Sequence, residues 1–328
     1  MPQKKGKIVV AELRRGSEKG LALAKKILHA EKMDTPKLRS ALEYYLEHWD
    51  DFTHAGLFSL ACEAVGGNPD DSVLAQAAVA MMAAAFDLHD DILDKSKAKN
   101  KILTVYGKFG VEIALLLGNA FLIEGFKTFA DATITFPKEK TVNILETTKN
   151  LLFEVGNAHV LEICFKQRKR VTPNDYMMIT ELKAASIESD LMLGALFGGG
   201  DESEVANLAK IGRILGVLAT LRDDLVDVFD IEELRQRIVV QDLPLPLLFA
   251  MQNKTINSKA TTIFSKPKMT RSDVSELVDL TLEAKPVAEI KDRMQLLIEE
   301  ATILLTRLPK KKLQSKLQAF ISFMLEDL

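Results

Sequence analysis

Apolar residues recur with the period of an α-helix through most of this chain. They fall at positions i, i+3, i+4 and i+7, and alternating strand-like patterns bounded by turn residues are nearly absent. The segments with the helical pattern are residues 38–49, 73–88, 111–132, 141–165, 175–197, 208–229 and 288–308. So many long amphipathic segments predict an all-α protein, because each must bury its apolar face against another helix.

The breaks between these segments are short. The sequence VTPND predicts Thr172 as a helix N-cap, with Pro173 in the first turn and Asp175 completing the cap. The stretch GGGD at residues 198–201 is predicted to end another helix. Because no long linker or low-complexity segment divides the chain, we expect a single domain over residues 1–328.

Composition narrows the classes of protein that fit. Hydrophobic residues make up 47% of the 328, which is ample for a folded core, and the net charge of −3 gives none of the basic excess typical of nucleic-acid binding. The two cysteines, Cys62 and Cys164, are too far apart for a zinc motif or a disulfide framework and fit a reducing compartment. The apolar run near the N-terminus is too short for a signal peptide, and residues 77–86 are too few to span a bilayer. We therefore expect a cytoplasmic protein.

Four aspartates crowd the end of the apolar segment at residues 73–88. Asp87, Asp90, Asp91 and Asp94 fall within an arc of about 100° on a helix, because residues three and four apart share a face. Carboxylates this close repel one another strongly in water-poor surroundings. A divalent cation relieves that repulsion, and Mg²⁺ prefers oxygen ligands while keeping positions for water and phosphate. The cluster therefore predicts a Mg²⁺ site that is open to a phosphate group.

A second cluster ends another apolar segment with the same spacing. Asp223, Asp224 and Asp227 again read D-D-x-x-D. Two solvated helix ends would be an ordinary alternative, but the repeated spacing favours two helices that face each other and hold several metal ions around one diphosphate. A di-iron carboxylate bundle would need Glu-x-x-His pairs, whereas here His159 precedes Glu162.

With these motifs the sequence resembles the trans-isoprenyl diphosphate synthase (polyprenyl synthetase) family over most of its length. HDDILD and LRDDLVD resemble the two aspartate-rich motifs of that family, and ELKAA resembles its lysine motif. The resemblance implies an all-α bundle around a central cavity, commonly as a homodimer, with Lys183 on the substrate diphosphate. The metal-side carboxylates that it implies are Asp90, Asp91, Asp94, Asp223, Asp224 and Asp227.

The reaction that the resemblance implies is the ionisation of an allylic prenyl diphosphate and its condensation with isopentenyl diphosphate. Breaking the carbon–oxygen bond leaves negative charge on the diphosphate, which metal ions and a fixed cation such as Lys183 stabilise. The carbocation that remains needs a dry, apolar cavity. In the family, residues just before the first aspartate cluster form the floor of that cavity, which implies this role for Ala85 and Phe86.

Several basic positions of the family pattern are changed. Counting back from LACEAVGG places Asp51, Phe52 and His54 where a lysine and two arginines usually grip isopentenyl diphosphate. A later GKxTLP reads QDLPLP, without its lysine. The usual Arg-Arg-Gly after the first cluster reads KNK from Lys99 onward, so we expect Lys99 to keep a partial hold on a phosphate.

These changes leave three functions open. Isopentenyl diphosphate is the default acceptor by resemblance. Alternatively, the enzyme passes the prenyl cation to another acceptor, or cyclises or quenches it as a class I terpene synthase does. As a third possibility, the chain is a subunit of a hetero-oligomeric synthase that tunes a catalytic partner.

Overall fold

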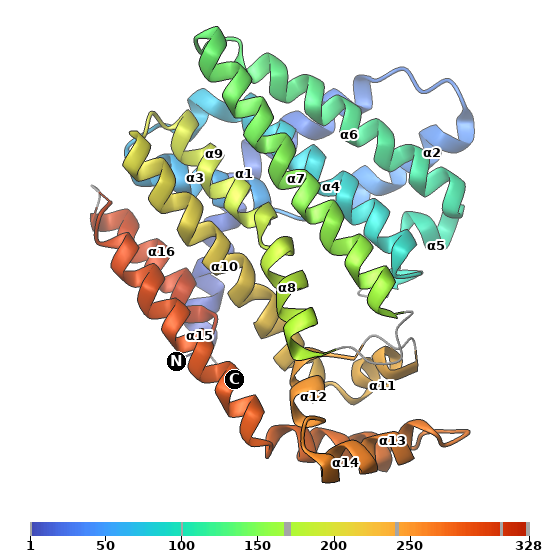
Figure 1. Cartoon of the computed structure of the whole chain (residues 1–328). Helices are drawn as coiled ribbons and strands as arrows, with labels where there is room; N and C mark the ends of the chain where they lie inside the picture. Colours follow the sequence, from blue (N-terminus) through green and yellow to red (C-terminus); the bar gives the residue numbers. More distant parts are fainter. Residues whose placement is uncertain (1, 100, 167–171, 240–242, 309–310, 326–328) are drawn as a thin grey trace.

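The computed structural model describes residues 2–99, 101–166, 172–239, 243–308 and 311–325, and it is almost entirely helical (Figure 1). This confirms the predicted all-α class. The helices are α1 (Pro2–Ala30), α2 (Pro36–His48), α3 (Thr53–Val65), the 3-10 helix η1 (Pro69–Ser72), α4 (Val73–Leu93), α5 (Val105–Phe109), α6 (Val111–Thr133), α7 (Lys138–Lys166), α8 (Pro173–Lys183), α9 (Ala185–Phe197), α10 (Glu202–Phe229), α11 (Ile231–Val239), α12 (Leu245–Ala250), α13 (Lys254–Phe264), α14 (Arg271–Leu282), α15 (Lys285–Leu305) and α16 (Lys311–Phe323). Two short antiparallel strands, β1 (Ala98–Lys99) and β2 (Ile102–Leu103), follow α4 and were not anticipated.

Local signals account for the helix ends near the site. Thr172 caps α8 in a reciprocal pair with Asp175, as predicted. Asp201 and Glu204 form the same arrangement at the start of α10, just after the GGGD stretch has ended α9. The residues QD of the QDLPLP stretch lie outside the described part of the chain.

One expected helix is in fact two. The pattern over residues 175–197 predicts continuous helix, but α8 ends at Lys183 and α9 begins at Ala185. Helix α10 passes very close at this point, since a Cβ added to Gly216 would lie 2.6 Å from the Cα of Ala184. The break therefore lets α10 approach, and it leaves Lys183 at the end of a helix.

The helices pack as a bundle whose long members run side by side. Helix α4 packs along α6, and α9 is held between α3 and α10. In Figure 1, α15 and α16 lie beside α10, whereas α11 to α14 gather at one end of the molecule. Buried apolar residues of α1, α3, α10 and α15 form one core cluster, and those of α4 and α6 contribute to two others.

Among the residues that the structure describes, two stretches are long and apolar enough to cross a bilayer by length and composition alone, residues 69–93 and 111–133. The first is 67% buried inside the protein over its most apolar window, so it is a core helix. The second, α6, is 39% buried and leaves part of its apolar face on the surface. The sequence expectation concerned only residues 77–86, which lie within the first of these stretches.

Candidate active site

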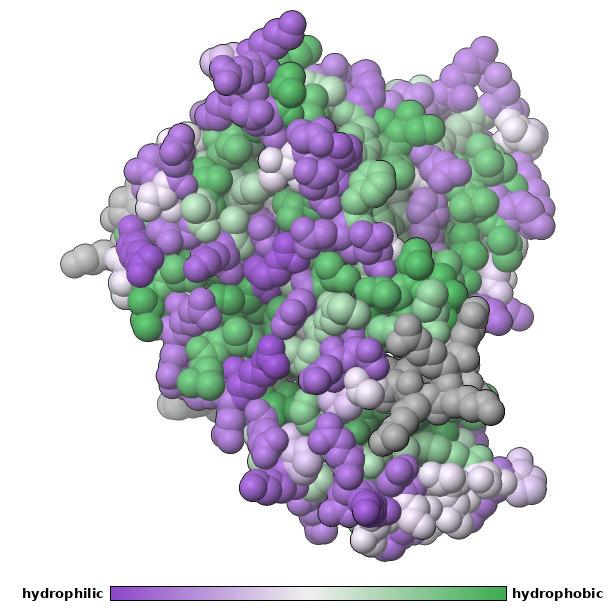
Figure 2. All heavy atoms as spheres, in the orientation of Figure 1, coloured by the Kyte–Doolittle hydropathy of each residue, from purple (hydrophilic) through white to green (hydrophobic). Residues whose placement is uncertain are grey.

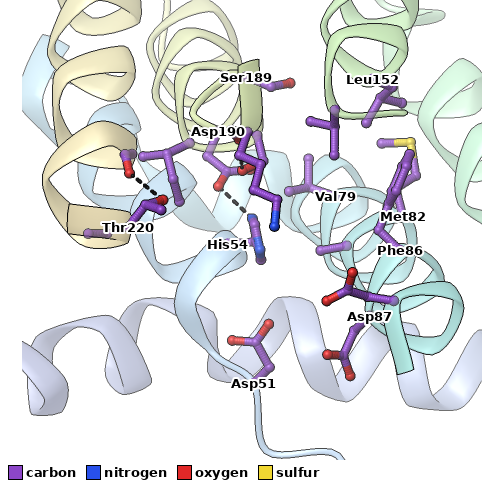
Figure 3. Close-up of a pocket in the computed structure, with 18 of the residues that line it drawn as sticks. Asp51, His54, Val79, Met82, Phe86, Asp87, Leu152, Ser189, Asp190 and Thr220 are labelled. Atoms are coloured by element: carbon purple, nitrogen blue, oxygen red, sulfur yellow. Dashed lines mark hydrogen bonds and ion pairs between the residues drawn. The ribbon is translucent and has the colours of Figure 1, made fainter. Parts of the chain in front are cut away.

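A cavity of about 340 Å³ lies among α3, α4, α7, α9 and α10 (Figure 3). Its apolar side is formed by Val79, Met82 and Phe86 of α4, together with Leu152 and Val155 of α7. In Figure 3 the labelled apolar side chains gather on one side together with Asp87, and His54 and Asp190 lie across from them. Ligand sites commonly combine such an apolar wall with a few convergent polar groups.

Asp90 brings the first aspartate cluster into this cavity. His159 Nδ1 of α7 lies 3.1 Å from Asp90 Oδ1 and 3.6 Å from Glu162 Oε2. Burial by itself raises the pKa of Asp90, but the hydrogen bond and charge of His159 outweigh it and lower that pKa overall. The same contacts raise the pKa of His159 to about 9. Asp90 is therefore held as a carboxylate.

Lys99 neutralises the neighbouring aspartates. Its Nζ lies 2.7 Å from Asp87 Oδ1 and 2.8 Å from Asp91 Oδ1. Burial raises the pKa of Asp91 to about 6, because the opposing pull of Lys99 is smaller. Lys99 thus acts within the cluster in this structure, and its predicted hold on a phosphate stays a prediction.

Lys183 lines the cavity from the end of α8. Its Nζ lies 2.6 Å from Glu162 Oε1. Burial lowers the pKa of Lys183, but the charges of Glu162, Asp90 and Asp94 raise it by more than burial lowers it. The pKa therefore lies above its ordinary value, and the side chain stays cationic. A bound diphosphate would need positive charge beside Asp90, and the ammonium group of Lys183 is fixed there.

One aspartate of the second cluster lines the cavity, and the other two form ion pairs with an arginine. Asp223 lines the cavity, and burial, followed by the charges of Asp227 and Asp224, raises its pKa to about 6. Asp224 and Asp227 each lie 2.8 Å from Nη1 of Arg237 on α11. The hydroxyl of Tyr176 also donates to Asp224 Oδ1 at 3.0 Å.

The structure therefore brings together part of the predicted site. On the cavity wall are Phe86, Asp90, Lys183 and Asp223. Outside its lining are Ala85, Asp91, Asp94, Lys99, Asp224 and Asp227. The site roles assigned to these ten residues stay predictions.

Ala85 does not line the cavity in this structure. Its side chain is fully buried in the cluster that joins α4 to α6, with Leu117 and Phe121. One residue along a helix turns a side chain by about 100°, so Ala85 points away from the cavity that Phe86 lines. Asp94 is exposed at the end of α4, where its backbone N–H donates to the carbonyl of Asp90 at 2.8 Å.

A second polar wall faces the cavity from α3 and α9. We call it the α3 wall and define it as Asp51, His54, Ser189 and Asp190, all of which line the cavity. His54 Nδ1 lies 2.7 Å from Asp190 Oδ2 (Figure 3). Burial lowers the pKa of His54, but the Asp190 carboxylate outweighs it and raises that pKa to about 9. His54 is therefore cationic at neutral pH.

Sequence reasoning missed several of these partners. His159 and Glu162 were considered only as a di-iron pair, and His54 was noted only at the position of a lost arginine. Asp190 and Arg237 were not singled out. The His54–Asp190 pair joins residues 136 positions apart. No local sequence pattern predicts such a pair. For His159 and Glu162, by contrast, the spacing of one turn on α7 indicated a possible contact.

The carboxylates that line the cavity can supply some of the oxygen ligands that Mg²⁺ prefers. Asp90 Oδ1 is buried and lies 3.1 Å from His159 Nδ1. Asp224 Oδ2, outside the cavity lining, is buried and has no hydrogen-bond partner among the described residues. Within that part of the chain no three acidic, histidine or cysteine groups form a ready metal cage. A Mg²⁺ ion that draws its remaining ligands from water and substrate phosphate needs only one or two carboxylates. Asp90 and Asp223 are placed for that.

Comparison with known proteins decides the family. The polyprenyl synthetase family model matches residues 35–281, which contain both aspartate clusters and Lys183. The chain belongs to the polyprenyl synthetase family. Its relatives include the short chain isoprenyl diphosphate synthase of Methanothermobacter thermautotrophicus, which is 29% identical over 186 residues covering 56% of each chain. The match thus spans little more than half the length of this polyprenyl synthetase relative.

Other members of the polyprenyl synthetase family widen the comparison. The heterodimeric geranylgeranyl pyrophosphate synthase large subunit 1 of Arabidopsis thaliana is 28% identical over 202 residues, 58% of this chain and 54% of that one. The crystal structure of geranylgeranyl pyrophosphate synthetase from Pyrococcus horikoshii superposes with a TM-score of 0.85. It covers 99% of this chain and all of its own at 23% identity, which establishes the shared fold.

Proposed function

We propose that this protein is a Mg²⁺-dependent prenyltransferase that ionises an allylic prenyl diphosphate and passes the prenyl group to an acceptor. The observation that carries this proposal is the meeting of Asp90, Asp223 and Lys183 on one cavity beside an apolar wall. Such a substrate requires carboxylates that bind the metal, a cation that binds the phosphate and an apolar surface that binds the hydrocarbon tail. The names of the relatives, isoprenyl and geranylgeranyl diphosphate synthases, support the same chemistry.

Each group has a role in the proposed reaction. Bound Mg²⁺ would supply Lewis acidity to the leaving diphosphate and orient it. Asp90 and Asp223 would hold the ions, and His159, 3.1 Å from Asp90 Oδ1, would keep that side chain charged and oriented. Lys183 adds a fixed positive charge where the carbon–oxygen bond breaks. The apolar side of the cavity, including Phe86, takes the prenyl tail and excludes water from the carbocation.

The acceptor and the assembly are separate parts of the proposal. The family of the chain favours isopentenyl diphosphate as the acceptor, whereas the acidic α3 wall favours an uncharged acceptor. For the assembly we propose a homodimer. One relative is named as the large subunit of a heterodimeric synthase, so a partner chain is a further candidate for assembly. We propose a cytoplasmic location on the composition of the sequence.

Product analysis tests the proposed function. The purified protein is incubated with geranyl, farnesyl or geranylgeranyl diphosphate, with Mg²⁺ or with EDTA, and the diphosphate that is released is measured. We expect release that requires Mg²⁺ with at least one substrate. Equal release in EDTA, or release from none of the three with Mg²⁺, would overturn the proposal. Activity that appears only after a partner chain is added would instead support the subunit role.

A further inference from the structure

The cavity has three chemically different sides, and one of them is left for a second reactant. If the proposed function holds, Asp90, Asp223 and Lys183 are occupied by the metal-bound diphosphate, and the apolar side is occupied by the prenyl tail. The remaining side is the α3 wall (Figure 3). A nucleophile that attacks the first prenyl carbon must therefore be held against this wall.

The α3 wall carries a net negative charge. Asp190 and His54 form an ion pair that cancels within itself. Asp51 forms no ion pair with any residue that the structure describes, and one of its oxygens, Oδ1, accepts the backbone N–H of Thr53 at 2.9 Å. The pair and the extra carboxylate together give the wall a charge of about −1 at neutral pH.

The other cationic side chains that line the cavity already form ion pairs with acidic residues. His159 is paired with Asp90, and Lys183 with Glu162. A second diphosphate at the α3 wall would therefore face a carboxylate, with no unpaired cation among the described cavity residues to hold it. An uncharged group that donates a hydrogen bond meets no such repulsion, and Asp51 can accept from it.

We propose that the acceptor held by the α3 wall is an uncharged molecule with a hydroxyl group, and not a second diphosphate. The allylic carbon–oxygen bond breaks and its electron pair leaves with the diphosphate. A lone pair of the acceptor hydroxyl oxygen then forms the new carbon–oxygen bond, and the hydroxyl proton passes to the Asp51 carboxylate. Asp51 is exposed, so it can release that proton to solvent. The products are diphosphate and a prenyl ether, or a prenyl alcohol when the acceptor is water.

A competition experiment tests this choice of acceptor. The full-length protein receives Mg²⁺, the allylic diphosphate that it cleaves best, isotopically labelled isopentenyl diphosphate and ethanol in water. We expect diphosphate release to be unchanged by isopentenyl diphosphate, with the prenyl group recovered as an alcohol or an ethyl ether. The alcohol identifies water as the acceptor, and the ether identifies an organic hydroxyl. Label in a longer diphosphate, or a hydrocarbon product, overturns the inference.

A charge reversal provides the matched test of binding. Affinity for isopentenyl diphosphate is measured with Mg²⁺ and an unreactive prenyl thiodiphosphate in wild type, Asp51→Lys and Asp50→Lys. Asp50 is exposed, adjacent to Asp51 and absent from the cavity lining, so its variant carries the same change of charge. We expect Asp51→Lys to bind isopentenyl diphosphate about tenfold more tightly than wild type. Asp50→Lys should stay within about twofold of wild type.

The outcomes separate the two proposals. If Asp51→Lys binds isopentenyl diphosphate no better than Asp50→Lys, the charge of the α3 wall does not select the acceptor and the inference fails. Asp51→Asn, which removes the charge with little change in shape, should give an intermediate affinity. If the wild type releases no diphosphate from any allylic substrate, the proposed function itself has failed, whatever the α3 wall binds.

Discussion

Asp90 and Asp223 come from helices far apart in the sequence, yet each has a carboxylate on the same cavity. The next aspartate of each motif forms an ion pair outside the cavity lining. Asp91 pairs with Lys99, and Asp224 pairs with Arg237. At the scale of residues, a D-D-x-x-D motif is therefore not one functional unit. One aspartate of each motif lines the cavity, although Asp90 is also paired with His159, and the next aspartate is held by a cation outside the lining.

Removing the carboxylate of Asp90 or Asp223 should reduce turnover far more than stability. We expect Asp90→Ala and Asp223→Ala each to lower the rate of diphosphate release at least about a hundredfold, since metal binding contributes several kcal/mol. Each change also relieves repulsion among acids, so the fold should persist by circular dichroism. The control is Asp131→Ala on α6, which removes an exposed acid paired with Lys127. Near-normal rates in both cavity variants would contradict the assignment.

The His54–Asp190 pair should make stability depend on pH above neutrality. The pKa of His54 is raised from 6.5 to about 9 in the folded protein, mainly because Asp190 outweighs burial, with smaller help from Asp51 and Asp87. Its contribution is fully present below pH 6.5 and is lost as the pH rises through 9. The loss is at most about 3 kcal/mol.

Urea unfolding between pH 6 and 10 measures this loss. The decrease in stability should be smaller in His54→Gln than in wild type, but should not vanish, because the pKa of His159 is raised in the same way. The exposed His48 serves as the control, and His48→Gln should retain the wild-type dependence. Identical pH profiles for His54→Gln and wild type would exclude a stabilising pair.

At the scale of helices, the close contact of α3 with α9 sets the position of the α3 wall. A Cβ added to Gly194 of α9 would lie 2.2 Å from the carbonyl oxygen of Phe58 on α3. Gly194→Ala should therefore push the helices apart and cost about 1–3 kcal/mol of stability. Gly156 of α7 has no neighbour within 4 Å of an added Cβ, so Gly156→Ala should be neutral or stabilising by up to about 1 kcal/mol. Thermal unfolding compares the two, and equal effects would contradict the packing argument.

Helices with regular apolar periodicity follow from local chemistry, which is why the sequence predicted them, whereas α1, α13 and α14 were not among the predicted segments. Apolar periodicity placed α4, α7 and α10, and the cap at Thr172 was correct because its partner Asp175 is three residues away. The break at Ala184 was not predictable, since it depends on the approach of α10 at Gly216.

The candidate site was predictable only where its signal is local. The repeated spacing of the aspartates located Asp90 and Asp223, and the short lysine motif located Lys183. Ala85 and Phe86 are adjacent in the sequence, but only Phe86 lines the cavity, because the rotation of α4 against its neighbours decides which side chain faces it. Arg237 was missed because only the folded chain brings α11 against α10.

At the scale of the whole molecule, α6 and α7 present apolar side chains to solvent. Ile123 is 70% exposed on α6, and Phe153 and Val160 are 67% and 57% exposed on α7. Figure 2 shows hydrophobic patches over these helices among hydrophilic residues. Apolar surface of this kind is typical of a subunit interface, so we expect a homodimer through α6 and α7.

Sedimentation of two charge variants tests this interface. Phe153→Asp places a charge in the expected contact and should shift the protein towards monomer. Ile303→Asp makes the same kind of change at a residue of α15 that is 58% exposed and far from α6 and α7 in Figure 1. It should leave the assembly unchanged. A monomeric wild type, or a dimer that both variants leave intact, would place the contact elsewhere.

The central claim is that Asp90 and Asp223 bind a prenyl diphosphate through Mg²⁺. The most direct measurement is the affinity of an unreactive farnesyl thiodiphosphate for the wild-type protein, titrated with Mg²⁺ and with EDTA. The account predicts that Mg²⁺ tightens binding at least about a hundredfold, and that Asp90→Asn with Asp223→Asn removes most of this gain. Equal affinity with and without Mg²⁺ in the wild type would contradict it.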